Sequence, residues 1–451
     1  MIINLPNGYY SYNMSETTTK YKILTGWDVG SNIKLVLKKD NVTSIKEITN
    51  VEWYFVIRKE DFDKLNQESF EKFNVKMNRR VVTRFAIDGD WVKIYCEQTS
   101  RDPLTEKLIR LLTNKGITVY ESDLSRTKRF LIDKNVEIAD NLNILYFDIE
   151  TDDTAGGIEI GRDRILSFAA YNNTGKKWFV VDDNEKVILE KFLKLLDKHD
   201  VFVGWNSLKF DWPYIQKRME LYGLRYNWRK KIHLDLMKRC IKMYSYEMDK
   251  IGLTGFSLNE VARVFLGDKK VEHAMGFKEM FDKDRVLLKK YNLKDAELLL
   301  KLDTKLGIIQ LMITECVWTG TTLDRFYVGE LLDNYMLRKS KILKQYLHSR
   351  PTREQSEKNS KIFIIGGYVM PPLKGIYSDV RIFDFKSLYP SMMVSWNIGD
   401  DSIDTEKSKL GDIAFKQFVN YPRKIEEVPF KEWFTFLRQQ KKKLDPHDEC
   451  Y

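Results

Sequence analysis

The sequence predicts a multidomain protein that combines α+β and α/β domains, and three observations support this fold class. At about 100–200 residues per domain, a chain of 451 residues has room for roughly two to four domains. Residues 20–135 alternate short β-like runs with polar turns, which is typical of a mixed α+β domain. From residue 143 onward, buried strands alternate with amphipathic helices, and this pattern indicates an α/β layer around a central sheet.

The expected elements follow from the period of the apolar residues. In the first region we expect strands at 32–38, 51–57, 81–86 and 91–95. In the second region we expect strands at 143–147, 164–171, 177–181 and 201–205, and helices at 185–198 and 212–222. Residues 284–348 are predicted to be mostly helical, and the polar stretch 351–361 is predicted to be a linker. Further strands are expected at 362–369 and 380–383, and a helix at 431–444.

Composition bounds the kind of partner and the compartment. A net charge of +10 suits a polyanionic partner, and 10 Trp, 23 Tyr and 25 Phe residues offer surfaces on which bases stack. Many lysine-rich proteins have the same composition, so this observation leaves nucleic acid open. The four cysteines lie far apart, which argues against a zinc site or a disulfide scaffold and fits a reducing interior. With no apolar run near the ~18 residues of a membrane span and no signal peptide, an intracellular protein is expected.

A pair of carboxylates ends the first apolar strand of the α/β region. Asp148 and Glu150 are two residues apart, so they share one face of the strand while Ile149 enters the core. Two neighbouring carboxylates repel each other unless a cation lies between them, and oxygen-only ligands suit Mg²⁺ or Mn²⁺. Such a pair is also common in a solvated turn, so a metal site requires further acids.

Two further acids have the context expected of the same site. Asp211 lies where a strand meets a helix, and with Pro213 in the first turn a helix cap is the alternative interpretation of this residue. A helix cap and a metal ligand can be the same residue. Asp295 lies four residues after Tyr291 on one helix face, next to an apolar stripe. A carboxylate so close to the core is expected to bind a cation. A surface aspartate is the alternative interpretation of Asp295.

Taken in order, Asp-x-Glu, Asn-x-x-x-Phe-Asp and Tyr-x-x-x-Asp resemble the three exonuclease motifs of proofreading DNA polymerases. The resemblance implies a DnaQ-like, RNase H-like exonuclease domain that holds two divalent ions, Mg²⁺ or Mn²⁺, about 3.5–4 Å apart. The ligands that it implies are Asp148, Glu150, Asp211 and Asp295.

The resemblance also assigns a role to Tyr291, which would orient the attacking water. Other residues near these ligands have expected roles as well. Asn206 and Phe210 are candidate DNA contacts, although Asn206 could instead brace its loop and Phe210 fits a packing role better. Asp235, in the run His233-Leu234-Asp235, is expected to support the site without binding metal.

Another apolar strand ends in Asp384 and is followed by the turn Ser387-Leu388-Tyr389-Pro390-Ser391. From the residues alone, Asp384 can hold a cation while the backbone N–H groups of the turn face a triphosphate and Tyr389 lies beneath the sugar. A strand-to-helix turn with a capping aspartate is the alternative. Asp-Phe-x-Ser-Leu-Tyr-Pro-Ser is similar to motif A of family B DNA polymerases. The resemblance implies that Asp384 binds both polymerase metal ions, that Ser387 and Leu388 contact phosphates, and that Tyr389 excludes the ribose 2′-OH.

Two more features fit the same family. Gly366 and Gly367 match its Tyr-x-Gly-Gly hinge between the two active sites and are candidate DNA contacts. Ile364 stands where the tyrosine is usual, so a primer-partitioning role of that tyrosine is not carried over. Arg438, on the expected first fingers helix, is a candidate triphosphate ligand, and a solvated charge is the alternative.

A family B polymerase continues with a second fingers helix, an Asp-Thr-Asp palm strand and a thumb, and this sequence contains none of these motifs. We therefore expect the N-terminal subunit of a split polymerase, or a fragment of a longer one, in which nucleotide addition needs a second polypeptide. The expected domains are the N-terminal domain (1–135), the exonuclease domain (136–318), part of the palm with a linker (319–395) and the start of the fingers (396–451).

The expected partners are a DNA primer–template, single-stranded 3′ ends and dNTPs, with a sliding clamp as a further candidate and no membrane. The expected location is the cytoplasm of a prokaryotic cell or of a virus-infected host. Two other functions fit part of the sequence. A free-standing single-strand 3′–5′ exonuclease with a vestigial palm disagrees with the intact motif A. A non-enzymatic single-strand DNA-binding protein disagrees with four converging acids, which would repel phosphate.

Overall fold

The computed structural model describes residues 21–40, 42–156, 159–272, 274–351, 353–361, 374–378, 380–381, 387–395, 414–418 and 425–429. The chain divides into two compact units, Met1–Lys361 and Ile362–Tyr451. No helix in the described part of the chain is both long enough and apolar enough to cross a bilayer.

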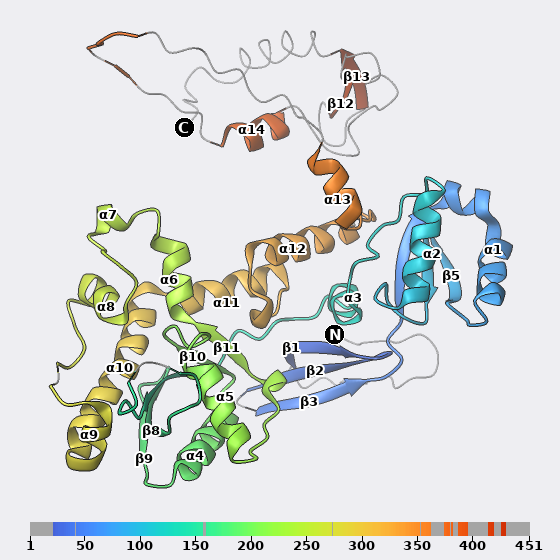
Figure 1. The fold of residues 1–451 in the computed structure, drawn as a ribbon. Coiled ribbons are helices and arrows are strands. Elements are labelled where there is room, and N and C mark those ends of the chain that lie inside the picture. Colours follow the sequence, from blue (N-terminus) through green and yellow to red (C-terminus); the bar gives the residue numbers. More distant parts are fainter. Residues whose placement is uncertain are drawn as a thin grey trace. The chain divides into compact units, whose positions relative to one another are not determined.

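Two antiparallel three-stranded sheets form the beginning of the first unit (Figure 1). The first sheet has the order β1–β2–β3, and the second has the order β4–β6–β5. Helices α1 and α2 pack on the second sheet through a core that includes Trp53, Phe55 and Ile94. The bounds are β1 (Lys22–Val29), β2 (Asn32–Lys39), β3 (Val42–Ile48), β4 (Trp53–Arg58), α1 (Lys59–Lys76), β5 (Val82–Asp88), β6 (Trp91–Cys96), α2 (Pro103–Asn114) and α3 (Arg126–Asp133).

A five-stranded sheet of order β11–β10–β7–β8–β9 forms the centre of the α/β region. Strands β7, β8 and β9 are antiparallel neighbours, whereas β10 runs parallel to both β7 and β11. The strands are β7 (Ile144–Thr151), β8 (Ile165–Asn172), β9 (Lys177–Val181), β10 (Val201–Gly204) and β11 (Ile232–Asp235).

Helices cover both faces of this sheet. The helices after β9 in the first unit are α4 (Glu185–Asp197), α5 (Asp211–Leu221), α6 (Leu236–Tyr244), α7 (Met248–Ile251), α8 (Leu258–Leu266), α9 (Phe277–Lys283), α10 (Arg285–Leu306), α11 (Ile308–Thr319), α12 (Val328–Ile342) and α13 (Arg353–Ser360). Two short 3₁₀ turns lie at Trp228–Lys230 and Leu323–Arg325. In the second unit the structure describes α14 (Leu388–Ser395) and an antiparallel pair, β12 (Ala414–Phe418) and β13 (Ile425–Pro429).

The alternation of side chains along β7 decides which of them meet which helices. Leu145, Phe147 and Ile149 belong to the core that contains α4 and α5. Ile144 and Tyr146 point to the opposite face, where the core contains residues of α8, α10 and α11. The even-numbered positions of β7 therefore face the long helix α10, and this places Asp148 and Glu150 on the α10 side.

The structure confirms the predicted strands and helices up to residue 348 to within a few residues at their ends, and it adds β1, β3, α1, α2 and α3 to the first region. The predicted linker at 351–361 is wrong as a description of structure, because residues 353–360 form α13. Its Arg, Glu, Gln and Lys side chains have high helix propensity, which composition alone does not separate from a linker. The predicted elements at 362–369 and 431–444, and most of that at 380–383, lie outside the described residues.

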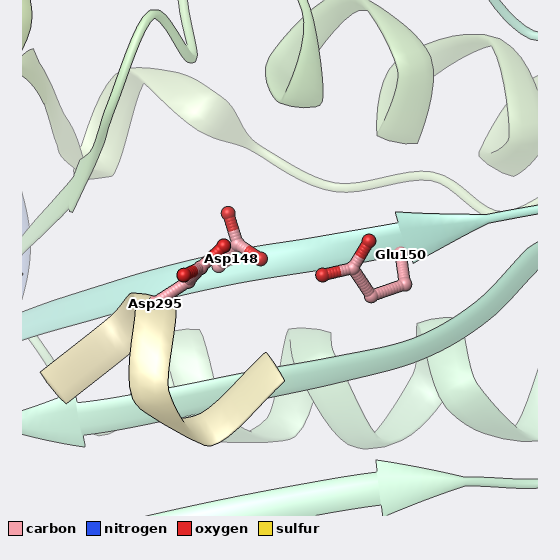
Figure 2. A group of neighbouring side chains, drawn as sticks. All are labelled: Asp148, Glu150 and Asp295. Atoms are coloured by element: carbon pink, nitrogen blue, oxygen red, sulfur yellow. The ribbon is translucent and has the colours of Figure 1, made fainter. Parts of the chain in front are cut away.

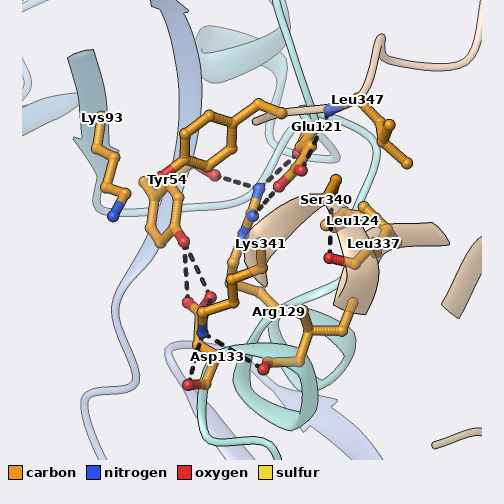
Figure 3. Close-up of polar contacts among 12 residues, drawn as sticks. Tyr54, Lys93, Glu121, Leu124, Arg129, Asp133, Leu337, Ser340, Lys341 and Leu347 are labelled. Carbon is orange, nitrogen blue, oxygen red and sulfur yellow. Dashed lines mark hydrogen bonds and ion pairs between the residues drawn. The ribbon is translucent and has the colours of Figure 1, made fainter. Parts of the chain in front are cut away.

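A buried ion pair joins three parts of the first unit that are distant in sequence (Figure 3). Arg129 of α3 pairs with the Glu121 carboxylate and donates hydrogen bonds to the carbonyl oxygens of Glu121 (2.7 Å) and Tyr54 (3.0 Å). Its guanidinium also lies 4.1 Å from the ring centroid of Tyr54. Glu121 in turn accepts from the backbone N–H of Leu347, which follows α12, at 3.3 Å. One charged side chain thus connects β4, α3 and the chain after α12.

Replacing Arg129 by Ala is expected to lower the free energy of unfolding of the first unit by about 3–5 kcal/mol, because the buried Glu121 carboxylate loses its counter-charge. Chemical unfolding of the purified chain measures this change. The matched control is Arg110→Ala, which removes a largely exposed guanidinium from α2. Equal losses for the two variants would contradict the prediction.

Candidate metal centre

Three carboxylates converge where α10 crosses β7. Asp148 and Glu150 lie on β7 and Asp295 lies on α10, and Figure 2 shows the three side chains gathered along the strand. One carboxylate oxygen from each lies within 4.8 Å of the other two. Glu150 and Asp295 are only 6% and 2% exposed, whereas Asp148 is partly buried. Such a group of oxygen donors, held out of water, has the chemistry that Mg²⁺ or Mn²⁺ requires.

Hydrogen bonds fix the register between α10 and the sheet. The Asn292 side-chain amide donates to Asp148 Oδ2 at 2.8 Å and to the Asp148 carbonyl oxygen at 3.3 Å. Ser167 of β8 donates to Asn292 Oδ1 at 3.1 Å. Nearer the end of α10, the Tyr146 hydroxyl donates to Asp303 Oδ2 at 2.6 Å. The helix is therefore held to the sheet on both sides of Asp295.

The electrostatics of the cluster favour either protons or a cation. Burial raises the pKa of Asp148 well above its usual value, and the charges of Asp295 and Asp211 raise it further. Burial likewise raises the pKa of Glu150, with Asp148 and Asp295 adding to the effect. Since both carboxyl groups resist ionisation together, a bound cation would stabilise the ionised forms.

The sequence analysis missed two residues of this site, Asn292 and Lys270, and Lys270 lies in the loop between α8 and α9. Its Nζ lies 2.6 Å from Asp295 Oδ2 and 5.7 Å from the ring centroid of Tyr291. Burial lowers the pKa of Lys270, but the charges of Asp295 and Asp148 outweigh burial and raise it above its usual value. Lys270 therefore carries a positive charge into the acidic cluster. A single lysine in a loop of a lysine-rich chain gives no sequence signal of this role.

The structure places Asp211 beside the three acids, and the alternative interpretation of this residue as a helix cap does not hold. Helix α5 begins at Asp211, the residue before it is Phe210, and no side chain caps the helix. The buried Asp211 carboxylate instead accepts hydrogen bonds from its own backbone N–H and from the backbone N–H of Ile149 on β7. Burial raises the pKa of Asp211 to about 7. Because its charge also raises the pKa of Asp148, Asp211 borders the cluster.

The other predicted nuclease residues have the following positions. Tyr291 is buried one turn before Asp295 on α10, and burial with the charge of Asp295 raises its pKa to about 12. Phe210 is partly buried in the core with α4 and α5, and its ring centroid lies 5.5 Å from that of Tyr214, as a packing role requires. Asn206 has a positive φ of 56° and donates its backbone N–H to Asp235 Oδ1 at 3.1 Å.

For the polymerase motif the structure describes only the turn and the helix after it. Ser387 has a φ of 52° and directly precedes α14, which begins at Leu388. Leu388 and Tyr389 are 45% and 80% exposed. The remaining candidates lie outside the described residues and stay predictions; they are Asp384, Gly366, Gly367 and Arg438.

The pKa shifts predict that divalent cations stabilise the protein more at high pH than at low pH. The usual pKa of an aspartate is 3.8 and that of Asp211 in the folded chain is about 7, so without a cation the folded state binds more protons between these values. Stability then falls as the pH rises through this window, and a cation that replaces the protons removes the loss. The increase in Tm caused by Mg²⁺ should therefore be larger at about pH 8 than at about pH 5.5.

Differential scanning calorimetry with and without Mg²⁺ at both pH values measures the difference. The variant that combines Asp148→Asn with Glu150→Gln serves as the control and should lose the pH-dependent part. An Mg²⁺ effect of equal size at both pH values would contradict the prediction.

Two regions of the chain match known protein families. Residues 145–281 match the RNase_H superfamily, and residues 325–432 match DNA polymerase family B. A DNA polymerase of Thermococcus litoralis is 27% identical over 337 residues, which cover 66% of this chain and 19% of that protein. A DNA polymerase of Pyrococcus glycovorans is 26% identical over 330 residues, covering 66% of this chain and 42% of that protein. The chain thus spans less than half the length of these two relatives.

A solved structure shares the fold. The family B DNA polymerase from the hyperthermophilic archaeon Pyrobaculum calidifontis has a TM-score of 0.63 at 21% identity, and the match covers 86% of this chain and 58% of that one. Together the matches confirm the predicted fold class and the resemblance drawn from the motifs. The chain is therefore similar to family B DNA polymerases, with a region that matches the RNase_H superfamily followed by a region that matches DNA polymerase family B.

Proposed function

We propose that the RNase H-superfamily domain is a 3′–5′ exonuclease that removes nucleotides from DNA 3′ ends with two divalent cations, Mg²⁺ or Mn²⁺. The observation that carries the proposal is the convergence of Asp148, Glu150 and Asp295 within 4.8 Å, with Asp211 at their border. These four acids would hold the cations. Bound cations of this kind activate a water molecule and stabilise the departing 3′ oxygen.

The residues around the acids prepare the site for this reaction. Asn292 holds the Asp148 carboxylate in one orientation through its hydrogen bond to Oδ2. Lys270 balances part of the negative charge at Asp295, so that the acids can lie close together before a cation binds. Tyr291, one turn from Asp295, orients the attacking water in this proposal. The net charge of +10 favours approach of a DNA strand to the molecule.

Replacing Asp148 by Asn is expected to slow cleavage of a 5′-labelled single strand at least ~100-fold, because loss of one metal-binding charge removes several kcal/mol of transition-state stabilisation. Stepwise shortening from the 3′ end on a denaturing gel measures the rate, and a chelator should abolish it. The matched control is Glu220→Gln on α5, which changes an exposed acid of the same domain. Full activity of the Asp148 variant, or no metal-dependent shortening by the unmodified chain, would refute the proposal.

We further propose that the family B polymerase region supplies half of a nucleotide-addition site. Asp384 would bind metal, Ser387 and Leu388 would contact the triphosphate, and Tyr389 would exclude the ribose 2′-OH. Arg438 is the candidate for a further triphosphate contact. A second polypeptide would supply the other palm aspartates, since the motif that carries them does not occur in this sequence.

A primer–template with all four dNTPs tests the partner requirement. The chain alone is expected to shorten the primer without extending it, because one palm aspartate cannot complete a two-metal site. A polypeptide that carries the missing palm motif should restore extension, and Asp384→Asn should abolish this extension while leaving the shortening intact. Extension by the chain alone would refute the need for a partner.

A further inference from the structure

The loop between β10 and α5 leads directly into Asp211, and its conformation leaves little freedom. Asn206 adopts a left-handed backbone with a φ of 56°, which few residues other than glycine adopt without support. At Gly204, a Cβ atom would lie 2.4 Å from the Cβ of Ser207. The chain therefore turns tightly at residues 204–207, and this turn needs contacts that stabilise it.

Asp235 provides these contacts. It is the last residue of β11, it lies opposite Gly204 in the parallel pairing of β10 with β11, and it is 3% exposed. Its carboxylate accepts hydrogen bonds from the backbone N–H groups of Asn206 (3.1 Å) and Leu208 (3.3 Å). The same carboxylate caps α6 through the N–H of Lys238 at 3.4 Å. One buried charge thus ties the loop to the start of a helix.

Backbone hydrogen bonds also connect the loop to the start of α5. The Asn206 carbonyl oxygen accepts from the N–H groups of Lys209 (3.0 Å) and Phe210 (3.2 Å). The Ser207 carbonyl oxygen accepts from the N–H of Trp212 at 2.8 Å. Asp211 lies inside the segment 207–212 that the second of these bonds closes, and its own carboxylate reaches the Ile149 N–H on β7.

We propose that Asp235 is a positioning residue for the nuclease site: it fixes the loop 206–210 so that Asp211 stays beside Asp148. The inference rests on the proposed function and names the residue on which the fourth acid depends. Asp235 acts through the loop and not on substrate, since its carboxylate is engaged with three backbone N–H groups. Its negative charge also adds to the field that attracts cations to Asp211.

The test is Mn²⁺ binding to the full chain, followed by electron paramagnetic resonance, for Asp235→Asn and for Asp200→Asn. Asp200 is the matched control, because it is also a buried carboxylate that accepts a backbone N–H, from Asn143 at 2.8 Å. Its side-chain partners Lys38 and Thr43 lie on β2 and β3, not in the loop. Asp235→Asn is expected to weaken Mn²⁺ binding by about 10–100-fold, the usual effect of losing a residue that orients a metal ligand. Asp200→Asn should lower Tm and leave Mn²⁺ affinity unchanged.

A second variant separates the loop from the helix cap. Asp235→Ser keeps an oxygen that caps α6, because serine is a good N-cap, but it removes the charge and the reach to both loop N–H groups. It should weaken Mn²⁺ binding as Asp235→Asn does, at a smaller cost in Tm. Unchanged Mn²⁺ affinity in both Asp235 variants, or an equal loss in Asp200→Asn, would overturn the proposal.

The two hypotheses can fail separately. An unmodified chain that binds Mn²⁺ without shortening DNA refutes the exonuclease and leaves the Mn²⁺ comparison to decide the role of Asp235. An unmodified chain that binds no Mn²⁺ refutes both.

Discussion

Three carboxylates held within 4.8 Å of one another repel, and burial removes the water that would screen the repulsion. The surrounding structure meets this constraint in two ways. Lys270 brings a positive charge to Asp295, and the raised pKa values of Asp148 and Glu150 allow protons to stand in for a cation. The acids are also prevented from moving apart, since Asn292 and Asp303 fasten α10 to the sheet on either side of Asp295. A cation would then enter a site whose repulsion has already been offset by folding.

The predicted part of this site depends on local signals. Alternation along an apolar strand is a property of five or six consecutive residues, so it was enough to place Asp148 and Glu150 on one face and Ile149 in the core. The same holds for β9, whose predicted bounds agree with the structure, and for α4 and α5, which agree to within a residue. That Asp295 lies beside β7 was predicted from the order of the three motifs, because residues 148 and 295 are too far apart in sequence for a local pattern to connect them.

The site residues that the sequence did not predict depend on contacts between distant segments. Lys270 contacts Asp295 across 25 residues of sequence, and Asn292 contacts Asp148 across 144. Neither contact produces a periodic pattern in the sequence that would predict it. A helix cap was the alternative interpretation of Asp211, but its carboxylate accepts from its own N–H and from the N–H of Ile149 on β7. The polymerase-site residues were predicted from sequence motifs alone. Asp384 and Arg438 lie outside the described residues, so their roles stay predictions.

The position of three functional contacts on α10 limits how this gene segment can vary in length. Asn292 and Asp303 are about three turns apart on a helix with 3.6 residues per turn, and both face the sheet together with Asp295. One inserted or deleted residue between them would rotate the following part of the helix by about 100°. Either Asp303 or Asp295 would then leave the sheet. Insertions and deletions should accordingly be purged from this stretch, while substitutions on its outward face remain free to accumulate.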